Sequence, residues 1–366
     1  MLVYVAKKIW SYIKKCRSIL KYIMVNEIIN MEPGEADSYL NEHAPALDST
    51  PITHNNIDNA EYDLMIIVPA YNSEKWIEEC ILSIISQKTE YSFYAVFVND
   101  GSKDKTGDIL ERYSNNKQVK IIHQSNKGYS GARNVALKNI NSNYIMFVDS
   151  DDYLLPNAIQ CLMDAAVKNG AEIVEGNGYR FNEFGRIAPI KKVGNNEEDQ
   201  YWGGPCLKVM KSSLWENFKF PEGFLYEDTI IGSLIFQLAE KIVLIDDEVY
   251  AYRIHEESIT QKHDDNIRRV DSYWIMLLMT KLQEEFNIKR DYSAYKKIMK
   301  HIVFTYRRTI FLSEQIKKAI FVSTGAFVFE YFKEYAGVKD KYYLLANALK
   351  KRDYAKYVVY CEELMF

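Results

Sequence analysis

The sequence has 366 residues, of which 48% are apolar and 26% charged, and its formal net charge is −4. These values are ordinary for a globular protein, and the length allows one large domain with extensions or two domains. Residues 1–24 carry six Lys/Arg and no Asp/Glu, and residues 266–366 carry 19 Lys/Arg against 11 Asp/Glu, so the middle is strongly acidic. An acidic middle argues against nucleic acid as a partner, whereas basic ends favour an anionic surface, most simply a membrane.

The cysteines and the apolar runs indicate the cellular compartment and whether the chain spans a membrane. No cysteine pair has the spacing of a metal site or a redox motif, which favours free thiols in a reducing cytosol. No stretch reaches the roughly 18 uninterrupted apolar residues of a membrane span. We therefore expect a cytoplasmic protein, placed at the inner face of the cell membrane by its basic ends. The cysteines are Cys16, Cys80, Cys161, Cys206 and Cys361.

Residues 2–24 are predicted to form a basic amphipathic helix. Apolar residues share one side of the helical wheel and most lysines lie away from it. This pattern is typical of a helix in a membrane interface, although a helix packed on the protein's own surface would also show it. A signal peptide is disfavoured because lysines interrupt the apolar residues and no small-residue cleavage site follows. Residues 25–61 are polar and acidic, and are predicted to be a linker.

From residue 62 onward, short apolar runs alternate with amphipathic segments. This alternation predicts an α/β domain over residues 62–262, in which a mostly parallel, Rossmann-like sheet has helices on both faces. Residues 263–366 are predicted to be mainly helical. The predicted strands are 64–68, 94–98, 119–122, 144–148, 242–245 and 249–254, and the predicted helices are 73–87, 102–113, 128–139, 156–169 and 227–240.

Polar motifs follow the first four predicted strands, at the edge where open α/β sheets bind ligands. They are Pro-Ala-Tyr-Asn at 69–72, Asn-Asp-Gly-Ser at 99–102, Asn-Lys-Gly at 126–128 with Gly-Ala-Arg-Asn at 131–134, and Asp-Ser-Asp-Asp at 149–152. An aromatic ring, a guanidinium and several carboxylates suit a base, a diphosphate and Mg²⁺ or Mn²⁺. The alternative for residues 149–152 is that they only cap the turn that follows.

Together, these motifs resemble those of a family 2 glycosyltransferase with the GT-A fold. They occur in order and at similar spacing, and the resemblance covers roughly residues 62–260. It implies an inverting enzyme, dependent on Mn²⁺ or Mg²⁺, that moves a hexose or N-acetylhexosamine from a UDP-sugar to a hydroxyl of a glycan or lipid-linked glycan. Synthesis of a bacterial surface polysaccharide is the process that such a reaction would serve.

The resemblance also implies roles for the matching residues on the donor side. Asp100 would accept a hydrogen bond from the imide N–H of uracil, and Asp151 would be the main metal ligand. Asp149 would lie near the ribose and the metal, with His255 as a further candidate ligand. Asp104 and Thr106 more simply shape the turn into the next helix. The implied nucleotide-sugar-binding residues are Pro69, Ala70, Tyr71, Asn72, Asp100, Asn126, Lys127, Arg133, Asp149, Ser150, Lys208, Arg253 and Ser258.

On the acceptor side, residues 220–229 resemble the family's Glu-Asp motif at the start of a helix. The resemblance implies that Asp228 is the general base and that Glu227 contacts the sugar or the acceptor. The alternative is that these carboxylates cap the helix, because a helix N-terminus lowers the pKa of a nearby carboxyl.

Two other classes of function remain open. A sugar nucleotidyltransferase needs a glycine-rich phosphate loop with a basic residue after the first strand, which residues 69–72 do not supply. If the protein were a catalytically inactive, membrane-associated scaffold with the same fold, some of the carboxylates that the resemblance assigns to the site would be missing. Asp100, Asp149, Asp151 and Asp228 are all present, which disfavours the scaffold.

Overall fold

The computed structural model describes residues 28–190, 203–255 and 265–365. The chain divides into two compact units, one of residues 47–262 and one of residues 1–46 together with 263–366. The predicted helix at 2–24 and the candidate residue Ser258 lie outside the described residues. Within the described part, no helix is both long and apolar enough to cross a membrane.

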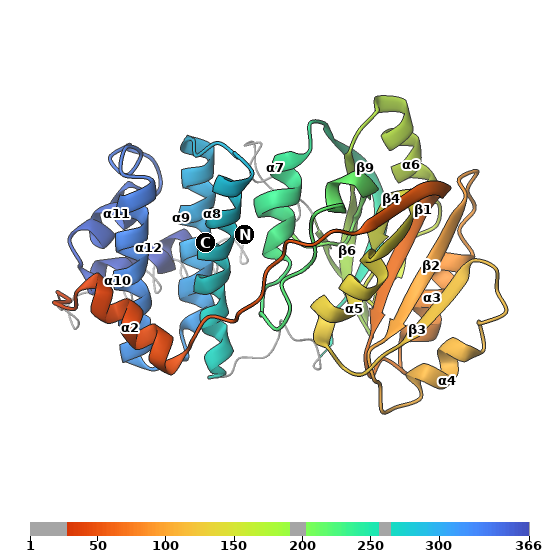
Figure 1. The fold of residues 1–366 in the computed structure, drawn as a ribbon, viewed down its shortest axis with the longest axis horizontal. Helices are drawn as coiled ribbons and strands as arrows, with labels where there is room; N and C mark the ends of the chain where they lie inside the picture. The colour runs from red at the N-terminus through yellow and green to blue at the C-terminus, as the bar shows by residue number, and fades with distance from the viewer. Residues whose placement is uncertain (1–27, 191–202, 256–264, 366) are drawn as a thin grey trace, which may run out of the picture. The chain divides into compact units, whose positions relative to one another are not determined.

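One mixed sheet runs through the unit of residues 47–262 (Figure 1), in the order β3-β2-β1-β4-β8-β6-β9-β5 with β7 paired to β6. Strands β3, β2, β1 and β4 are parallel, whereas β8 runs antiparallel to both of its neighbours. The predicted α/β fold class is confirmed, with the sheet parallel at one end and mixed at the other. The strands are β1 (Asn56–Ala70), β2 (Phe93–Asn99), β3 (Val119–His123), β4 (Asn139–Phe147), β5 (Tyr153–Leu154), β6 (Ile173–Asn182), β7 (Gly185–Ile190), β8 (Lys208–Lys211) and β9 (Ile242–Arg253).

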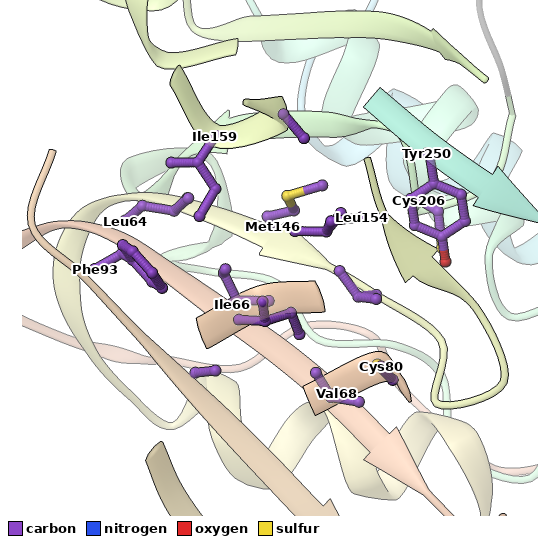
Figure 2. Packing of buried hydrophobic residues seen from close by; sticks show 14 of the residues in the cluster. Leu64, Ile66, Val68, Cys80, Phe93, Met146, Leu154, Ile159, Cys206 and Tyr250 are labelled. Atoms are coloured by element: carbon purple, nitrogen blue, oxygen red, sulfur yellow. The ribbon is translucent and has the colours of Figure 1, made fainter. Parts of the chain in front are cut away.

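Helices cover both faces of this sheet because its central strands are apolar on both sides. On one face, Leu64, Ile66 and Val68 of β1 join a core (Figure 2) to which α3, α4 and α6 contribute. Helix α5 contacts β1, β2 and β4 on the opposite face. The helices are α3 (Ile77–Ile85), α4 (Thr106–Glu111), α5 (Gly128–Leu137) and α6 (Ala158–Asn169), followed by the short helical segments η2 (Ser212–Trp215), η3 (Ile231–Ile235) and α7 (Phe236–Leu238).

The apolar spacing in the sequence explains how these helices pack. In α3, Ile77, Cys80, Ile81 and Ile84 follow helical periodicity and are all fully buried. Burial of each large aliphatic side chain contributes about 1.5–3 kcal/mol. Helix α6 ends at Gly170, whose positive φ of 58° is a conformation that glycine adopts without strain.

The second unit is helical in its described residues, as predicted for residues 263–366. Side chains at the helix starts specify several boundaries: Asp291, Ser313 and Asp353 each accept a hydrogen bond from a backbone N–H in the first turn of the following helix. The elements are α2 (Pro33–His43), η5 (Ile267–Val270), α8 (Asp271–Glu285), α9 (Tyr292–Thr309), α10 (Glu314–Tyr331), α11 (Tyr343–Lys350) and α12 (Tyr354–Leu364).

The prediction of a linker over residues 25–61 is wrong for two segments within it. Residues 33–43 form α2, which packs against α10, and β1 already begins at Asn56. Helix α2 buries only Ala36 and Leu40, one turn apart, so its polar composition concealed a helix that tertiary packing stabilises. The start of β1 pairs with the start of β4, from Asn56 opposite Asn139.

Three further boundaries also differ from the predictions. The helix expected over 102–113 begins only at Thr106, because residues 101–105 form turns. The helix expected over 227–240 is present as a shorter continuous helical segment over 229–238, whose middle part, η3, is a π-helix and whose end is α7. The two strands expected at 242–245 and 249–254 form one strand, β9, because both halves pair with β6 and a register shift accommodates the charged residues between them.

Candidate functional site

The motifs that follow β1, β2 and β3 meet at one edge of the sheet. Ala70 at the end of β1 lies opposite Asn99 at the end of β2, and Asn99 lies opposite His123 at the end of β3. The backbone N–H of Asp100 donates to the carbonyl of Ala70 at 2.9 Å. The structure therefore brings these loops together, as expected for parallel strands whose carboxyl ends share an edge.

Asp100 fastens the loop after β2 to the loop after β3. Its side chain is buried, and Oδ1 accepts hydrogen bonds from the backbone N–H of Lys127 at 2.8 Å and from Nε2 of Gln124 at 2.7 Å. Gly101 permits this close approach: its φ is 73°, and a Cβ there would lie 2.9 Å from the nitrogen of Asn126. The side chain of Asn126 accepts from the N–H of Gly128 at 3.3 Å, so it stays within its own turn.

The loop after β1 is held by residues of the loop after β2. Asn72 has a positive φ of 49°, and its Oδ1 accepts from the backbone N–H of Lys103 at 2.8 Å. Asp104 accepts from the N–H groups of Glu74 and Thr106, each at 3.0 Å, as expected of a residue that shapes this turn. Tyr71 is 42% exposed beside Pro69 and Ala70, which leaves its ring available to a ligand.

The three carboxylates after β4 have three different surroundings. Strand β4 ends at Phe147, and residues 149–152 form a turn in which the N–H of Asp152 donates to the carbonyl of Asp149 at 3.1 Å. Asp149 Oδ1 accepts from Arg133, whereas Asp151 Oδ2 lies 2.8 Å from Nε2 of His255. Asp152 is 2% exposed and points inward. Ser150 and Asp151 occupy the central positions of the turn.

Asp149, Asp151 and Asp152 form a carboxylate cluster, in which burial and mutual repulsion raise the pKa values of Asp151 and Asp152. Burial and the charge of Asp149 raise the pKa of Asp151, and the hydrogen bond from His255 opposes that rise. Burial and the charges of Asp151 and Asp149 raise the pKa of Asp152 well above its usual range. A cation placed beside Asp149 and Asp151 would relieve this repulsion.

The described residues offer a metal two ligands of suitable chemistry, Asp151 and His255. No group of three or more His, Cys, Asp or Glu within that part of the chain is arranged to hold a metal ion. Nδ1 of His255 is buried without a hydrogen-bond partner, and its ring packs on Trp76 with 4.1 Å between centroids. Asp149 is less suited, because Arg133 already occupies one of its oxygens at 3.0 Å. The donor set therefore fits a metal whose remaining ligands come from a substrate.

Arg133 lies between two carboxylates. The resemblance implied a guanidinium that is accessible to the nucleotide sugar, but in the structure this side chain is buried. Its side chain is 5% exposed; Nη1 donates to Oε1 of Glu227 at 2.8 Å and Nη2 to Oδ1 of Asp149 at 3.0 Å. Burial by itself would lower the pKa of Arg133, but the charges of Asp149 and Glu227 outweigh it and raise that pKa. Arg133 thus brings the Glu-Asp motif to the carboxylate cluster.

Helix α5 also positions the segment that carries Glu227 and Asp228. The amide of Asn134 donates to the carbonyl of Phe220 at 2.9 Å and accepts from its N–H at 2.8 Å, and Ser130 donates to the carbonyl of Pro221. Burial raises the pKa of Glu227, while Arg133 lowers it. Asp228 is half-buried at the start of a helical turn, where its carbonyl accepts from the N–H of Ile231 at 3.0 Å.

Lys208 lies inside the sheet and not at the site, contrary to the expectation for it. Both Lys208 and Glu175 are 0% exposed, and Nζ of Lys208 lies 3.1 Å from Oε2 of Glu175. The two residues are neighbours in register on β8 and β6. Nζ also donates to the carbonyl of Gly204 at 2.6 Å.

Arg253, a candidate for binding the nucleotide sugar, lies beside the turn of residues 149–152. Its Nε donates to the carbonyl of Asp151 at 2.7 Å, and its guanidinium forms an ion pair with Glu79 of α3. Its side chain also packs on the ring of Phe181 at 4.5 Å. These contacts orient Arg253 toward the same loop that His255 reaches.

Sequence reasoning missed several residues of this site. Tyr129 lies near the cluster: burial and the charges of Asp149 and Asp151 raise its pKa to about 12. Its position directly after Gly128 of the third motif was a usable signal. Trp76, Cys206 and Tyr250 lie outside the four motifs and reach the site through tertiary packing.

Residues 65–215 match the family described as Glycosyl transferase family 2. The chain carries a family 2 glycosyltransferase domain. The glycosyltransferase GlyA of Streptococcus pneumoniae is 32% identical over 219 residues, which span 54% of this chain and 31% of that protein. The poly(ribitol-phosphate) β-N-acetylglucosaminyltransferase TarS of Staphylococcus aureus is 33% identical over 210 residues, which span 52% of this chain and 35% of that protein.

The crystal structure of S. aureus TarS 1–349 in complex with UDP-GlcNAc has the same fold as this chain. It superposes with a TM-score of 0.66 at 23% identity, covering 83% of this chain and 91% of that one. The glycosyltransferase domain described here therefore has the GT-A architecture that its motifs predicted. The matched region spans about a third of the length of GlyA and of TarS.

Proposed function

We propose that this protein is an inverting, metal-dependent glycosyltransferase that moves a sugar from a UDP-sugar to a hydroxyl of a glycan or lipid-linked glycan acceptor. One observation carries the proposal: Arg133 joins Asp149 of the donor-side cluster to Glu227 of the acceptor-side motif, so both sets of carboxylates face one site. The UDP-GlcNAc in the TarS structure is in keeping with a nucleotide-sugar donor.

The proposed donor pocket is formed by the loops after β1, β2 and β3. Tyr71 offers a ring for stacking on the base, beside Pro69 and Ala70. Asp100 offers a carboxylate for the imide N–H of uracil, and Lys127 lies beside it on the loop after β3. Asp149 and Ser150 lie on the side of the ribose and diphosphate.

In the proposed reaction, Asp228 takes the proton of the acceptor hydroxyl as its oxygen attacks the anomeric carbon. The bond from that carbon to the diphosphate breaks, and UDP leaves with the electron pair from the opposite face. A single displacement of this kind inverts the anomeric centre. We assign the base to Asp228 and not to Glu227, because Nη1 of Arg133 already occupies Oε1 of Glu227 at 2.8 Å.

We propose Asp151 and His255 as the protein ligands of Mn²⁺ or Mg²⁺, with the remaining ligands supplied by the diphosphate. A bound divalent cation supplies neutralisation of the charge that develops on the leaving diphosphate. Asp151 presents its carboxylate, and His255 is steered toward it by the packing of its ring on Trp76.

The replacement Asp151→Asn is expected to make UDP binding insensitive to Mn²⁺, because it removes the charged ligand of the metal. Titration calorimetry of UDP with and without Mn²⁺ measures this. We expect Mn²⁺ to tighten binding at least tenfold in the unmodified protein and less than twofold in the variant. The matched control is Asp108→Asn on the exposed side of α4. An unchanged response to Mn²⁺ in Asp151→Asn would remove this residue from the metal site.

The donor assignment itself is tested with a panel of nucleotide sugars in the presence of Mn²⁺. UDP-linked hexoses and N-acetylhexosamines are expected to raise the melting temperature and to be hydrolysed slowly to free UDP, whereas GDP- and CMP-sugars are not. If no UDP-sugar binds, the proposed donor is wrong.

We also propose that the protein works at the cytoplasmic face of a membrane, where lipid-linked acceptors of surface polysaccharides are made. An exposed face of α9 supports this. Lys300, Phe304 and Arg307 lie at helical spacing on that face, and Phe311 follows just beyond the helix; Phe304 is 40% and Phe311 55% exposed. Exposed aromatic rings between cations suit the headgroup region of an anionic bilayer.

Charge reversal on this face is expected to weaken vesicle binding. Each basic residue near an anionic membrane contributes about 1 kcal/mol, so the double variant Lys300→Glu/Arg307→Glu should bind phosphatidylglycerol vesicles at least tenfold more weakly in flotation assays. Lys350→Glu/Lys351→Glu on and beside α11 makes the same change of charge and serves as the control. Equal binding by the two double variants would contradict the docking face.

A further inference from the structure

Asp152 and Tyr250 form a buried hydrogen-bonded pair beneath the carboxylate cluster. The hydroxyl of Tyr250 donates to Oδ2 of Asp152 at 2.7 Å and accepts from the backbone N–H of Asp149 at 3.1 Å. Oδ1 of Asp152 accepts from the backbone N–H of Arg253 at 2.7 Å. Asp152 is 2% and Tyr250 0% exposed, so neither can touch a substrate. We call these two side chains the Asp152–Tyr250 pair.

We propose that the Asp152–Tyr250 pair is a positioning device that holds the turn of residues 149–152 against the end of β9 and thereby sets the affinity for the donor. The inference rests on the proposed function, because it concerns donor binding at the same site. It gives a role to Asp152, which the sequence motif includes but the proposed reaction does not use.

The atoms that the pair holds are the reason for a positioning role. Tyr250 fixes the N–H of Asp149, and Asp152 fixes the N–H of Arg253. Arg253 in turn donates from Nε to the carbonyl of Asp151, and His255 follows two residues later. The same side chains therefore set the backbone of Asp149, Asp151 and the segment that carries His255.

The side chains around the pair offer few other hydrogen-bond donors that could replace the hydroxyl of Tyr250. Tyr250 belongs to the apolar core beneath the site and lies with Cys206 at one end of it (Figure 2). Sγ of Cys206 lies 3.5 Å from Oδ2 of Asp149, and Sγ of Cys80 lies 3.7 Å from the carbonyl of Asp149. Thiols are weak hydrogen-bond donors, so they cannot replace the hydroxyl of Tyr250. Outer partners of this kind commonly tune metal sites, and their loss costs about 10–100-fold in affinity or activity.

The test compares Tyr250→Phe with Tyr144→Phe in the full-length chain. Tyr144 is a control on β4 of the same sheet, because its hydroxyl makes a hydrogen bond away from the carboxylates, to the carbonyl of Ala171 at 2.8 Å. Both variants should lose thermal stability, and Tyr250→Phe more of it, because its hydroxyl makes two hydrogen bonds and that of Tyr144 one. Only Tyr250→Phe is expected to raise the dissociation constant of UDP with Mn²⁺ and the KM for the donor about tenfold, while the KM for the acceptor stays unchanged.

Amide hydrogen exchange gives a readout that does not depend on activity. Peptides that contain residues 149–153 and 250–255 should exchange about tenfold faster in Tyr250→Phe than in the unmodified protein, and unchanged in Tyr144→Phe. Asp152→Asn should act in the same direction. If Asp152→Asn fails to fold, the exchange and binding measurements on Tyr250→Phe test the inference by themselves.

Each outcome bears on the inference. Unchanged exchange and unchanged UDP affinity in Tyr250→Phe would overturn it, as would equal effects of the two Tyr variants. Faster exchange with unchanged UDP affinity would leave a structural pair without a role in donor binding, which also overturns it. If the unmodified protein binds no UDP-sugar, the proposed function and the link to donor affinity both fail, and exchange alone then decides whether the pair holds the turn.

Discussion

The replacement Asp228→Asn is expected to lower the rate of sugar transfer by about 10²- to 10⁴-fold, which is the usual contribution of a positioned general base. An amide of the same shape cannot take the proton of the acceptor hydroxyl. In the proposed reaction Asp228 acts on the acceptor, so the dissociation constant of UDP should change less than twofold. Transfer is measured as turnover with acceptor at saturating donor, and UDP binding by calorimetry.

The control for this variant is Asp247→Asn, which makes the same change at an exposed carboxylate of β9. Glu227→Gln is informative beside it, because it removes the charge that faces Arg133 and keeps Asp228. If Asp228→Asn retains more than a third of the transfer rate while Glu227→Gln loses most of it, the base would have to be Glu227. If neither variant loses transfer, the proposed mechanism is wrong.

The replacement Arg133→Met is expected to lower the free energy of unfolding by about 3–5 kcal/mol, because it leaves the carboxylates of Glu227 and Asp149 without their shared cation. Arg133 is 4% exposed, so water cannot take its place easily. Transfer should fall as well, because nothing then holds the Glu-Asp motif at the cluster. The change in stability is measured from the urea concentration at which half of the protein is unfolded. The dependence of the free energy of unfolding on urea concentration should stay the same.

A second replacement separates lost charge from lost packing. Arg133→Met/Glu227→Gln should recover part of the stability, since a buried amide costs less than a buried unpaired carboxylate. Arg112→Met is the control, because the ion pair of Arg112 with Glu78 spans 3.7 Å between largely exposed side chains and should contribute little. If Arg133→Met costs no more than Arg112→Met, the buried bridge is not a stabilising feature.

Local patterns made the parallel half of the sheet predictable. Four apolar runs of strand length, each followed by polar residues, could only be buried parallel strands with their motifs at one edge. The structure has them in that arrangement, with Ala70 opposite Asn99 and Asn99 opposite His123. Helix α2 was missed because it buries only two side chains, so its own sequence resembles that of an exposed segment.

The sequence by itself determined the family, the α/β fold and which loops would carry the chemistry, because these depend on short-range spacing along the chain. Only the tertiary structure decided what each charged side chain faces. Arg133 and Lys208 are basic residues for which the resemblance implies a place at the nucleotide sugar, yet one is bound between Asp149 and Glu227 and the other to Glu175. Asp152 and Asp151 are adjacent and identical in type, but one turn of backbone buries the first against Tyr250 and presents the second to His255. The partner of a buried charge is set by strands and helices that meet from distant parts of the chain, and no local pattern encodes that meeting.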